Sequence, residues 1–257
     1  MKICGRTQMI DQYPFCESFQ VLKNLGFDGV EICLEKRDWE LRQELFQNEY
    51  LDTCKEALSA LSLSPFSVSY HCDYIYKDTA LEYLKKLIPA ARYLGAEILV
   101  YSGAKKQSAD ADEWMLMKSK TKELVRIAEH NGIILANEPE PNFIVGTTQE
   151  LLRLFDEIPS DNLACNLDLG HVFLCDPDPM KAIQLLGSKV VHAHVENMQT
   201  GVHRHLLPQQ GDMDLKAYFE ALDRIGFKGG MALDIYDYDY QKEAPEAISY
   251  LRSLLPK

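Results

Sequence analysis

Residues 190–196 have the sequence Val-Val-His-Ala-His-Val-Glu, and a second His-x-His pattern follows at residues 203–205. In a β-strand, His192 and His194 point to one face, and the small apolar residues next to them point to the other. Two imidazoles on one strand face are a common beginning of a metal site. Because such a pair is as often buried in a core, the metal interpretation requires acidic residues that converge on the same point.

The strand around His194 is one of eight in a regular pattern of short apolar strand, polar turn and longer helix. We expect strands at residues 2–7, 29–34, 65–71, 97–102, 133–138, 162–168, 189–195 and 229–235. We expect helices at about 15–25, 40–62, 78–94, 110–131, 147–157, 178–187, 214–226 and 243–255. This alternation indicates parallel βαβ units, and the count of eight favours a closed (β/α)₈ TIM barrel, an α/β fold, over an open sheet. No glycine-rich nucleotide-binding motif supports the open sheet, so residues 1–257 are expected to form one TIM barrel domain.

Capping and turn residues support these boundaries. Thr147-Thr148-Gln149-Glu150 predicts a capped helix start, and Asp214 is placed to cap the helix that follows it. Gly26 and Gly95 each follow a helical run, where a left-handed residue commonly ends a helix.

The composition is that of an acidic globular chain of 257 residues with a formal net charge of −12. This charge repels a polyphosphate backbone, and the densest basic clusters are only Lys85-Lys86 and Lys105-Lys106, so no nucleic-acid partner is expected. The seven cysteines lack CxxC or zinc-ribbon spacing, which favours reduced thiols in a cytoplasmic protein. No apolar run has the length of a membrane helix, and the first residues lack the apolar segment of a signal peptide.

Polar residues occur at the carboxyl ends of most expected strands, where the active sites of such barrels lie. Strand alternation places a set of these side chains inside the barrel mouth: His71, Glu138, Asp168, His192, His194 and Asp234. Carboxylates packed this closely repel one another, and burial raises their pKa values further. A bound cation is the simplest way to stabilise them.

We therefore predict a site for one divalent metal ion formed by Glu138, Asp168, His194 and Asp234. A shell rich in oxygen with one imidazole suits Mn²⁺, Mg²⁺ or Co²⁺, and Zn²⁺ also fits. Four protein ligands leave two positions of an octahedron open for neighbouring oxygens of a hydroxy-ketone, whose carbonyl the ion would polarise. Each residue alone is more often structural, since a buried Asp at a strand end often caps the next helix, so the prediction rests on the four together.

Over essentially its whole length, the chain resembles the xylose isomerase-like TIM barrel superfamily. This superfamily includes sugar isomerases and epimerases, inosose dehydratases and repair enzymes of the endonuclease IV type. The matching stretches are Gly29-Val30-Glu31-Ile32, Glu138 within the sequence ANEPEP, Asp168-Leu169-Gly170-His171, His192-Ala193-His194, and HLLPQQG from His205 to Gly211 before Asp212. Their order and spacing are specific for the superfamily rather than for one reaction.

The resemblance to ketose 3-epimerases of this superfamily implies roles for these residues. Glu138, Asp168, His194 and Asp234 correspond to the Glu, Asp, His and Glu that hold the metal there. Glu138 and Asp234 would also transfer protons on opposite sides of the substrate carbon, and His171 would contact the substrate.

The chain departs from those epimerases at two positions. Asp234 stands where Glu is usual, and aspartate is one methylene shorter, so its reach to the substrate is smaller. Thr200 stands where those epimerases have an arginine, which leaves Arg204 or Arg6 to fill that role.

The resemblance to the endonuclease IV type implies a three-zinc site. That site can be followed here at His71, Glu138, Asp168, His171, His194 and His205, with His203 and Asp234 as substitutions. Ser102 replaces one of its histidines, and the acidic chain lacks the basic groove that DNA requires. A single ion is therefore expected, while His171 and His205 leave room for a second metal.

Several residues near the mouth have two interpretations each. Glu140 either contacts a substrate hydroxyl or is a charge of the loop, and Glu31 either contacts substrate or holds a lysine or arginine inside the barrel. Trp39 and Trp114 either line a sugar site or pack beneath loops. The run from Tyr236 to Tyr240 fits either a loop that closes the mouth or a contact in a homo-oligomer.

We expect a metal-dependent isomerase or epimerase that acts on a small-molecule sugar or polyol ketone through a metal-stabilised enediolate. The expected substrate contacts are His71, Glu140, His171, Arg204 and His205. No phosphate cradle is evident, which favours an unphosphorylated substrate. The alternatives are a dehydratase (lyase) of an inosose-like keto-polyol, an endonuclease IV-like phosphodiesterase, and a barrel that binds a sugar without converting it.

Overall fold

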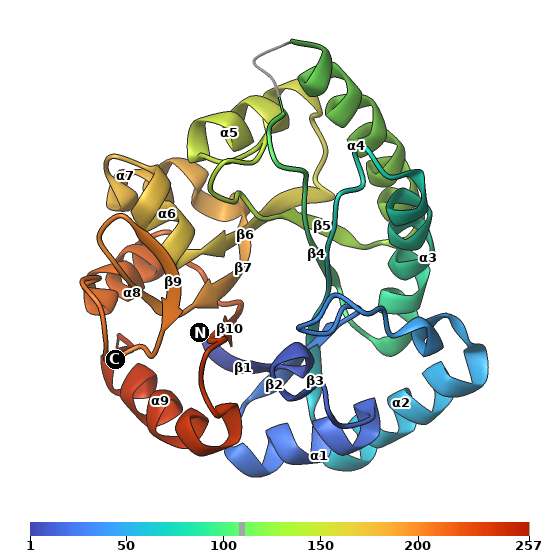
Figure 1. Ribbon diagram of the computed structural model, residues 1–257, viewed down its shortest axis with the longest axis vertical. Coiled ribbons are helices and arrows are strands. Elements are labelled where there is room, and N and C mark those ends of the chain that lie inside the picture. The colour runs from blue at the N-terminus through green and yellow to red at the C-terminus, as the bar shows by residue number, and fades with distance from the viewer. Residues whose placement is uncertain (108–110, 257) are drawn as a thin grey trace.

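Eight short strands with apolar outer faces pair in parallel and close into a barrel. The structure is a computed structural model that describes residues 1–107 and 111–256. The strand order is β1-β10-β7-β6-β5-β4-β3-β2, and helices surround the strands (Figure 1). The expected (β/α)₈ TIM barrel is confirmed.

The secondary-structure elements have the following bounds. The barrel strands are β1 (Lys2–Arg6), β2 (Gly29–Cys33), β3 (Ser64–His71), β4 (Ile98–Ser102), β5 (Ile134–Asn137), β6 (Leu163–Asp168), β7 (Val190–Val195) and β10 (Gly230–Leu233). The helices are α1 (Phe15–Leu25), α2 (Asn48–Leu61), α3 (Asp78–Leu94), α4 (Ala111–Asn131), α5 (Thr148–Glu157), α6 (Leu169–Cys175), α7 (Pro179–Leu186), α8 (Leu215–Arg224) and α9 (Tyr240–Leu254). A hairpin of β8 (Asn197–Gln199) and β9 (Val202–Leu206) follows β7, and 3₁₀ turns occupy Thr7–Ile10, Gln43–Phe46 and Gly187–Lys189.

Local signals in the sequence fix the helix ends as expected. Thr147 and Glu150 form a reciprocal capping box at the start of α5, and Asp214 accepts a hydrogen bond from the backbone of Ala217 at the start of α8. Gly26 ends α1 with a φ of 92°, a left-handed conformation that side chains with a Cβ rarely adopt.

The start of α2 was predicted wrongly. The helix begins at Asn48 rather than near residue 40, because the loop after β2 doubles back on itself. Glu35 and Leu41 form an antiparallel bridge, and the backbone N–H of Arg42 donates to Leu34 O at 2.8 Å. The expected helix start at residue 110 and the expected end of the domain at residue 257 lie outside the described residues.

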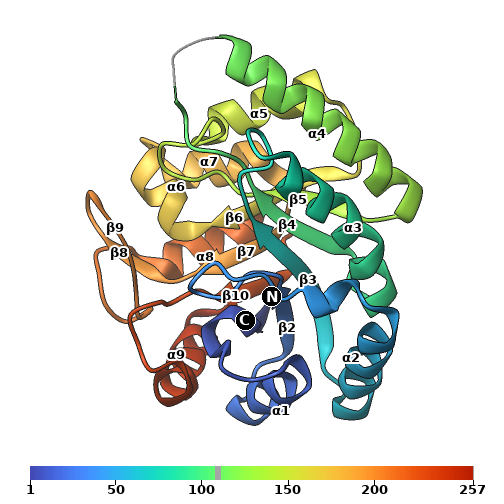
Figure 2. The same ribbon diagram turned by 45° about the vertical axis from the view of Figure 1, so that its right-hand side comes forward.

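The helix α6 and the β8–β9 hairpin were not predicted. The seven residues of α6 are too few to show a helical period. Its start is fixed by Asp168, whose Oδ1 accepts from the backbone N–H of His171 at 2.7 Å. The hairpin packs against α6 and projects from the barrel beside it (Figure 2), so two elements missed in the sequence bound the same side of the mouth.

The barrel interior is polar, unlike the apolar layer between strands and helices. Arg6, Glu31, Ser67, Asn166 and His192 are all at most 1% exposed. Buried polar groups are costly unless they are paired. These five side chains pair with one another and form a connected network beneath the mouth. None of the helices in the described ranges is long and apolar enough to cross a bilayer.

Candidate metal and substrate site

Four buried side chains meet where β5, β6, β7 and β10 end. Glu138 follows β5, Asp168 ends β6, His194 lies in β7 and Asp234 follows β10, and none is more than 3% exposed. The Nδ1 atom of His194 lies 3.1 Å from Glu138 Oε2, 3.9 Å from Asp168 Oδ2 and 3.8 Å from Asp234 Oδ2. Ligand atoms on one ion with bonds of about 2.1 Å lie about 3 Å apart when adjacent and about 4 Å apart when opposite. Each of the three carboxylates therefore lies at ligand-to-ligand distance from His194. Glu138, Asp168 and Asp234 also belong to overlapping groups that could hold an ion, one of which consists of Asp168, Glu196, His205 and Asp234.

Two buried atoms of this group, Asp168 Oδ2 and His194 Nδ1, form no well-aligned hydrogen bond with any described residue, although His194 Nδ1 lies within ion-pair distance of Glu138 Oε2. Such atoms are rare in folded proteins, because each one has lost its hydrogen bonds to water. They fit a divalent ion, which Glu138, Asp168, His194 and Asp234 would hold.

Without an ion, protons bound to the histidines balance the negative charge of the buried carboxylates. Burial alone would lower the pKa of His194, but the charges of Glu138 and Glu31 raise it to about 10. Burial alone would raise the pKa of Glu138, but His194 and His71 hold it well below its usual range. Because metal ligation requires a neutral imidazole, a bound ion would replace the proton on His194.

A buried arginine joins the site from the end of β1. Arg6 Nε lies 2.8 Å from Glu31 Oε1, and its Nη1 contacts Asp234 Oδ1. Glu31 therefore holds an arginine inside the barrel, which confirms one of its two sequence interpretations. Glu31 also lies 3.2 Å from His194 Nε2, and this contact turns the Nδ1 atom of the ring toward the candidate ion site.

His71 links two carboxylates across the mouth. Its Nδ1 lies 2.9 Å from Glu35 Oε1, and its Nε2 lies 3.0 Å from Glu138 Oε2. Burial would lower the pKa of His71, but Glu138 and Glu35 raise it well above its usual value. Glu35 was missed in the sequence because it lies in the loop after β2, where strand alternation no longer indicates direction.

Deeper in the barrel, His192 supports the site indirectly. Its Nδ1 lies 2.9 Å from Asn166 Oδ1 and its Nε2 lies 3.0 Å from Ser67 Oγ. Asn166 in turn donates to Glu138 Oε2 at 2.6 Å, so it orients that carboxylate. Asn166 was not identified in the sequence, although it lies two residues before Asp168 and shares its inward direction.

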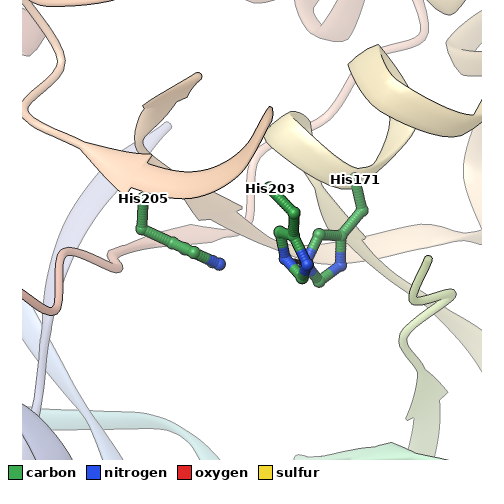
Figure 3. A group of neighbouring side chains, drawn as sticks. All are labelled: His171, His203 and His205. Atoms are coloured by element: carbon green, nitrogen blue, oxygen red, sulfur yellow. Dashed lines mark hydrogen bonds between the residues drawn. The ribbon is translucent and has the colours of Figure 1, made fainter. Parts of the chain in front are cut away.

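Three histidines form a second cluster at the mouth. Figure 3 shows His171 projecting from α6, and His203 and His205 from β9, toward a shared space. Their ring nitrogens lie within 4.8 Å of one another. His171 Nδ1 is 3.0 Å from Pro139 O, and His205 Nδ1 is 3.1 Å from Asp234 O. A carbonyl only accepts hydrogen bonds, so each Nδ1 carries the hydrogen.

The third member of this cluster, His203, was matched in the sequence as a substitution in the endonuclease IV pattern, and the resemblance also suggested a substrate contact or a vestigial second metal site for it. Its Nε2 lies 3.0 Å from His171 Nε2. Burial and the neighbouring imidazoles of His171 and His205 lower the pKa of His203 to about 4. The cluster is suited to hydrogen-bond with hydroxyl groups or to bind a divalent ion that favours imidazole ligands, such as Zn²⁺.

Glu196 is a buried carboxylate for which the sequence suggested no role. Its Oε1 accepts from the backbone N–H of Gly170 at 2.6 Å, and its Oε2 has no hydrogen-bond partner in the described part of the chain. Burial, together with the charges of Asp168 and Asp234, raises its pKa well above the usual value. A neutral Glu196 adds no further charge beside Asp168. It lies two residues after His194, so strand alternation could have identified it.

Glu140 and Arg204 occupy different environments. Glu140 lines the mouth together with His71 and Ser102, and burial, followed by the charge of Glu138, raises its pKa to about 7. Arg204 is exposed, and its Nε pairs with Asp237 Oδ2 at 3.2 Å. Of the two arginines considered in the sequence, Arg6 lies within the site and Arg204 lies on the surface.

Comparisons with known proteins agree with this architecture. The fructoselysine 3-epimerase of Shigella flexneri is 22% identical, with 100% of this chain and 98% of that protein covered. The structure of the probable 3-DHS dehydratase AsbF of Bacillus anthracis has a TM-score of 0.85 at 17% identity and covers 98% of this chain and 99% of its own. The structure of the IOLI protein, which contains a zinc atom, has a TM-score of 0.80 at 20% identity and covers 99% of this chain and 94% of its own.

A sequence model of one family, described as a xylose isomerase-like TIM barrel, matches residues 19–254. This match spans nearly the whole chain and agrees with the closed barrel of eight strands. The protein therefore belongs to the xylose isomerase-like TIM barrel family.

Proposed function

We propose that the protein is a divalent-metal-dependent isomerase or epimerase of a sugar or a related polyol ketone. The observation that carries this proposal is that the buried carboxylates of Glu138, Asp168 and Asp234 each place an oxygen within 4 Å of the buried His194 Nδ1. Asp168 Oδ2 has no hydrogen-bond partner among the described residues. The similarity to fructoselysine 3-epimerase supports the reaction class, and the zinc atom of the IOLI structure supports the metal. The seven free cysteines support a cytoplasmic location.

Glu138, Asp168, His194 and Asp234 would hold the ion. Mn²⁺, Mg²⁺, Co²⁺ and Zn²⁺ all suit three carboxylates and one imidazole. A bound ion would polarise the substrate carbonyl and stabilise the negative charge that develops when the neighbouring carbon loses its proton.

Glu138 and Asp234 are the proposed proton-transfer pair. They follow β5 and β10, which are separated in the barrel by β6 and β7, so they approach the mouth from different sides. Arg6 contacts Asp234 Oδ1, which leaves Oδ2 directed toward the mouth, 3.3 Å from His205 Nδ1. His71 lies 3.0 Å from Glu138 Oε2 and holds that carboxylate in its ionised form.

The substrate hydroxyl groups would contact His71, Glu140, His171 and His205. The Nε2 atoms of His171 and His205 would form hydrogen bonds with these hydroxyls. Alternatively, His171, His203 and His205 would hold a second metal ion. The number of ions bound per chain distinguishes a second metal site from a substrate contact.

Solvent exchange tests the proposed reaction. The purified protein is stripped of metal, loaded with Mn²⁺, Co²⁺, Mg²⁺ or Zn²⁺, and incubated in D₂O with free ketohexoses and ketopentoses. We expect deuterium at the carbon next to the carbonyl, together with the epimeric or isomeric sugar, only in the metal-loaded samples. No bound ion, no thermal shift with any of the four ions, or exchange that is insensitive to a chelator would contradict the proposal. Loss of water from the substrate would indicate a dehydratase instead.

A further inference from the structure

Two cysteine side chains meet between α1 and α2, helices that lie side by side on the outside of the barrel (Figure 1). Cys16 lies in the first turn of α1, and Cys54 lies in α2. Their thiols are hydrogen-bonding neighbours. Cys16 Sγ also lies 3.9 Å from the backbone oxygen of Thr53, the residue before Cys54. The candidate metal ligands come from β5, β6, β7 and β10, so this thiol pair is outside the site described above.

Aromatic packing holds α1 and α2 in a fixed register beside the thiols. The rings of Phe15 and Tyr50 have centroids 6.3 Å apart, and the Phe15 N–H donates to the Tyr50 hydroxyl oxygen at 3.4 Å. Tyr50 and Cys54 are four residues apart, so they lie on the same face of α2. The contact at Phe15 therefore keeps the next residue, Cys16, close to Cys54. A fixed register matters because a disulfide requires Cβ atoms about 3.5–4.5 Å apart.

The two thiols differ in their access to solvent. Cys16 is half-buried, whereas Cys54 is fully buried. Burial raises the pKa of the Cys54 thiol to about 12, and the neighbouring Cys16 adds to this rise. A small oxidant in solution can therefore reach Cys16, while Cys54 is shielded from it. An accessible thiol beside a second thiol that can resolve its oxidised form is the arrangement of reversible oxidation sites.

Arg42 connects the thiol pair to the loop after β2. Its guanidinium carbon lies 3.5 Å from the centroid of the Phe15 ring. Its positive charge acts to lower the pKa of Cys54, against the larger effect of burial, and so favours the thiolate that attacks an oxidised sulfur. The same loop contains Glu35, whose carboxylate contacts His71 at the mouth. A covalent link between α1 and α2 would therefore close a ring of chain that contains β2 and this loop.

We propose that Cys16 and Cys54 form a reversible oxidation site, at which a peroxide converts the two thiols into a disulfide between α1 and α2. The peroxide first transfers one oxygen atom to the Cys16 sulfur, its O–O bond breaks, and one water leaves. Cys54 then attacks the sulfenic sulfur of Cys16. The S–S bond forms, the S–O bond breaks, and the hydroxyl group leaves with the Cys54 proton as a second water. The two thiols lose two electrons, which reduce the peroxide.

The disulfide would stabilise the folded chain. A cross-link of this kind acts mainly by restricting the unfolded chain, and the effect grows with the length of the ring that it closes. We expect the melting temperature of the oxidised protein to be higher by about 5–10 °C. Reduction by a dithiol should return it to its original value, because the bond is reversible.

Peptide mapping of the full-length protein tests the proposal. The reduced protein is treated briefly with hydrogen peroxide, the remaining thiols are blocked with iodoacetamide, and an unreduced digest is analysed by mass spectrometry. We expect one pair of peptides joined through Cys16 and Cys54. The mass of the whole chain before blocking should be lower by two hydrogen atoms, and dithiothreitol should restore both the mass and the melting temperature.

Three variants locate the reaction. Cys54→Ser should stop the reaction at the sulfenic acid of Cys16, which dimedone traps, and should show no rise in melting temperature. Cys16→Ser should leave Cys54 unoxidised, because Cys54 is buried. Cys175→Ser is the matched control, because it removes another half-buried thiol from a helix. It should form the same disulfide as the wild-type chain.

Three results would overturn the proposal. They are oxidation of Cys16 that never joins it to Cys54, disulfides that involve other cysteines in place of this pair, and a Cys16–Cys54 bond that forms only after denaturation. An oxidised protein that melts no higher than the reduced one would contradict the stabilising role of the bond. These measurements require no metal and no substrate, so they are independent of the exchange experiment that tests the proposed function.

Discussion

Glu138→Gln is expected to lower the rate of metal-dependent proton exchange by about 10³-fold at saturating metal. Glutamine keeps the size of the side chain and one of its oxygens, so its contact with Asn166 can be retained. It loses the negative charge and the ability to accept a substrate proton. The rate is measured as deuterium uptake by NMR, with the metal concentration raised until the rate no longer depends on it.

Two controls test whether the effect of Glu138→Gln is specific to this residue. Glu220→Gln removes a charge from the surface helix α8 and should leave the exchange rate within about 2-fold of the wild type. Circular dichroism of both variants checks the fold. An exchange rate in Glu138→Gln close to that of the wild type would contradict the assignment of Glu138 as the base.

Arg6→Leu is expected to lower the free energy of unfolding by about 3–5 kcal/mol in the metal-free protein. Arg6 is 1% exposed, and it pairs with Glu31 and Asp234, which are also buried. Removal of the guanidinium takes the main countercharge from buried Asp234 and leaves Glu31 with His194 as its charged partner. Urea denaturation measures the change, and addition of Mn²⁺ should return part of the lost stability because the ion neutralises Asp234.

Arg37→Leu is the matched control for this change. Arg37 also pairs with a carboxylate at 2.8 Å, that of Asp11, but its side chain is 42% exposed. Water screens this pair, so the expected loss is below about 1 kcal/mol. A loss in Arg6→Leu no larger than that in Arg37→Leu would show that the buried network around Asp234 does not stabilise the barrel.

The fold was predictable because strand alternation and capping residues repeat along the chain. The same alternation placed Glu138, Asp168, His194 and Asp234 inside the barrel, because side-chain direction in a strand follows from sequence position alone. It extends to Asn166, which could have been recognised by the same rule. The inward direction of these side chains could be predicted without knowledge of any loop conformation.

Contacts that depend on loops were not predictable. Glu35 reaches His71 from the doubled-back loop after β2, and the part of that loop from residue 40 onward was predicted as helix. His203 meets His171 only through the β8–β9 hairpin, which has no periodic signal over its short strands. Trp39 and Phe143, about a hundred residues apart, line one pocket because of loop conformations that side-chain patterns do not encode.

The position of the metal is the most direct test of the whole account. A crystal of the protein grown with Mn²⁺ and measured for anomalous scattering would locate the ion without assumptions about activity. We predict one strong peak coordinated by Glu138, Asp168, His194 and Asp234 at about 2.0–2.4 Å. No peak at these side chains, or a peak only at His171, His203 and His205, would contradict the proposed site and the reaction built on it.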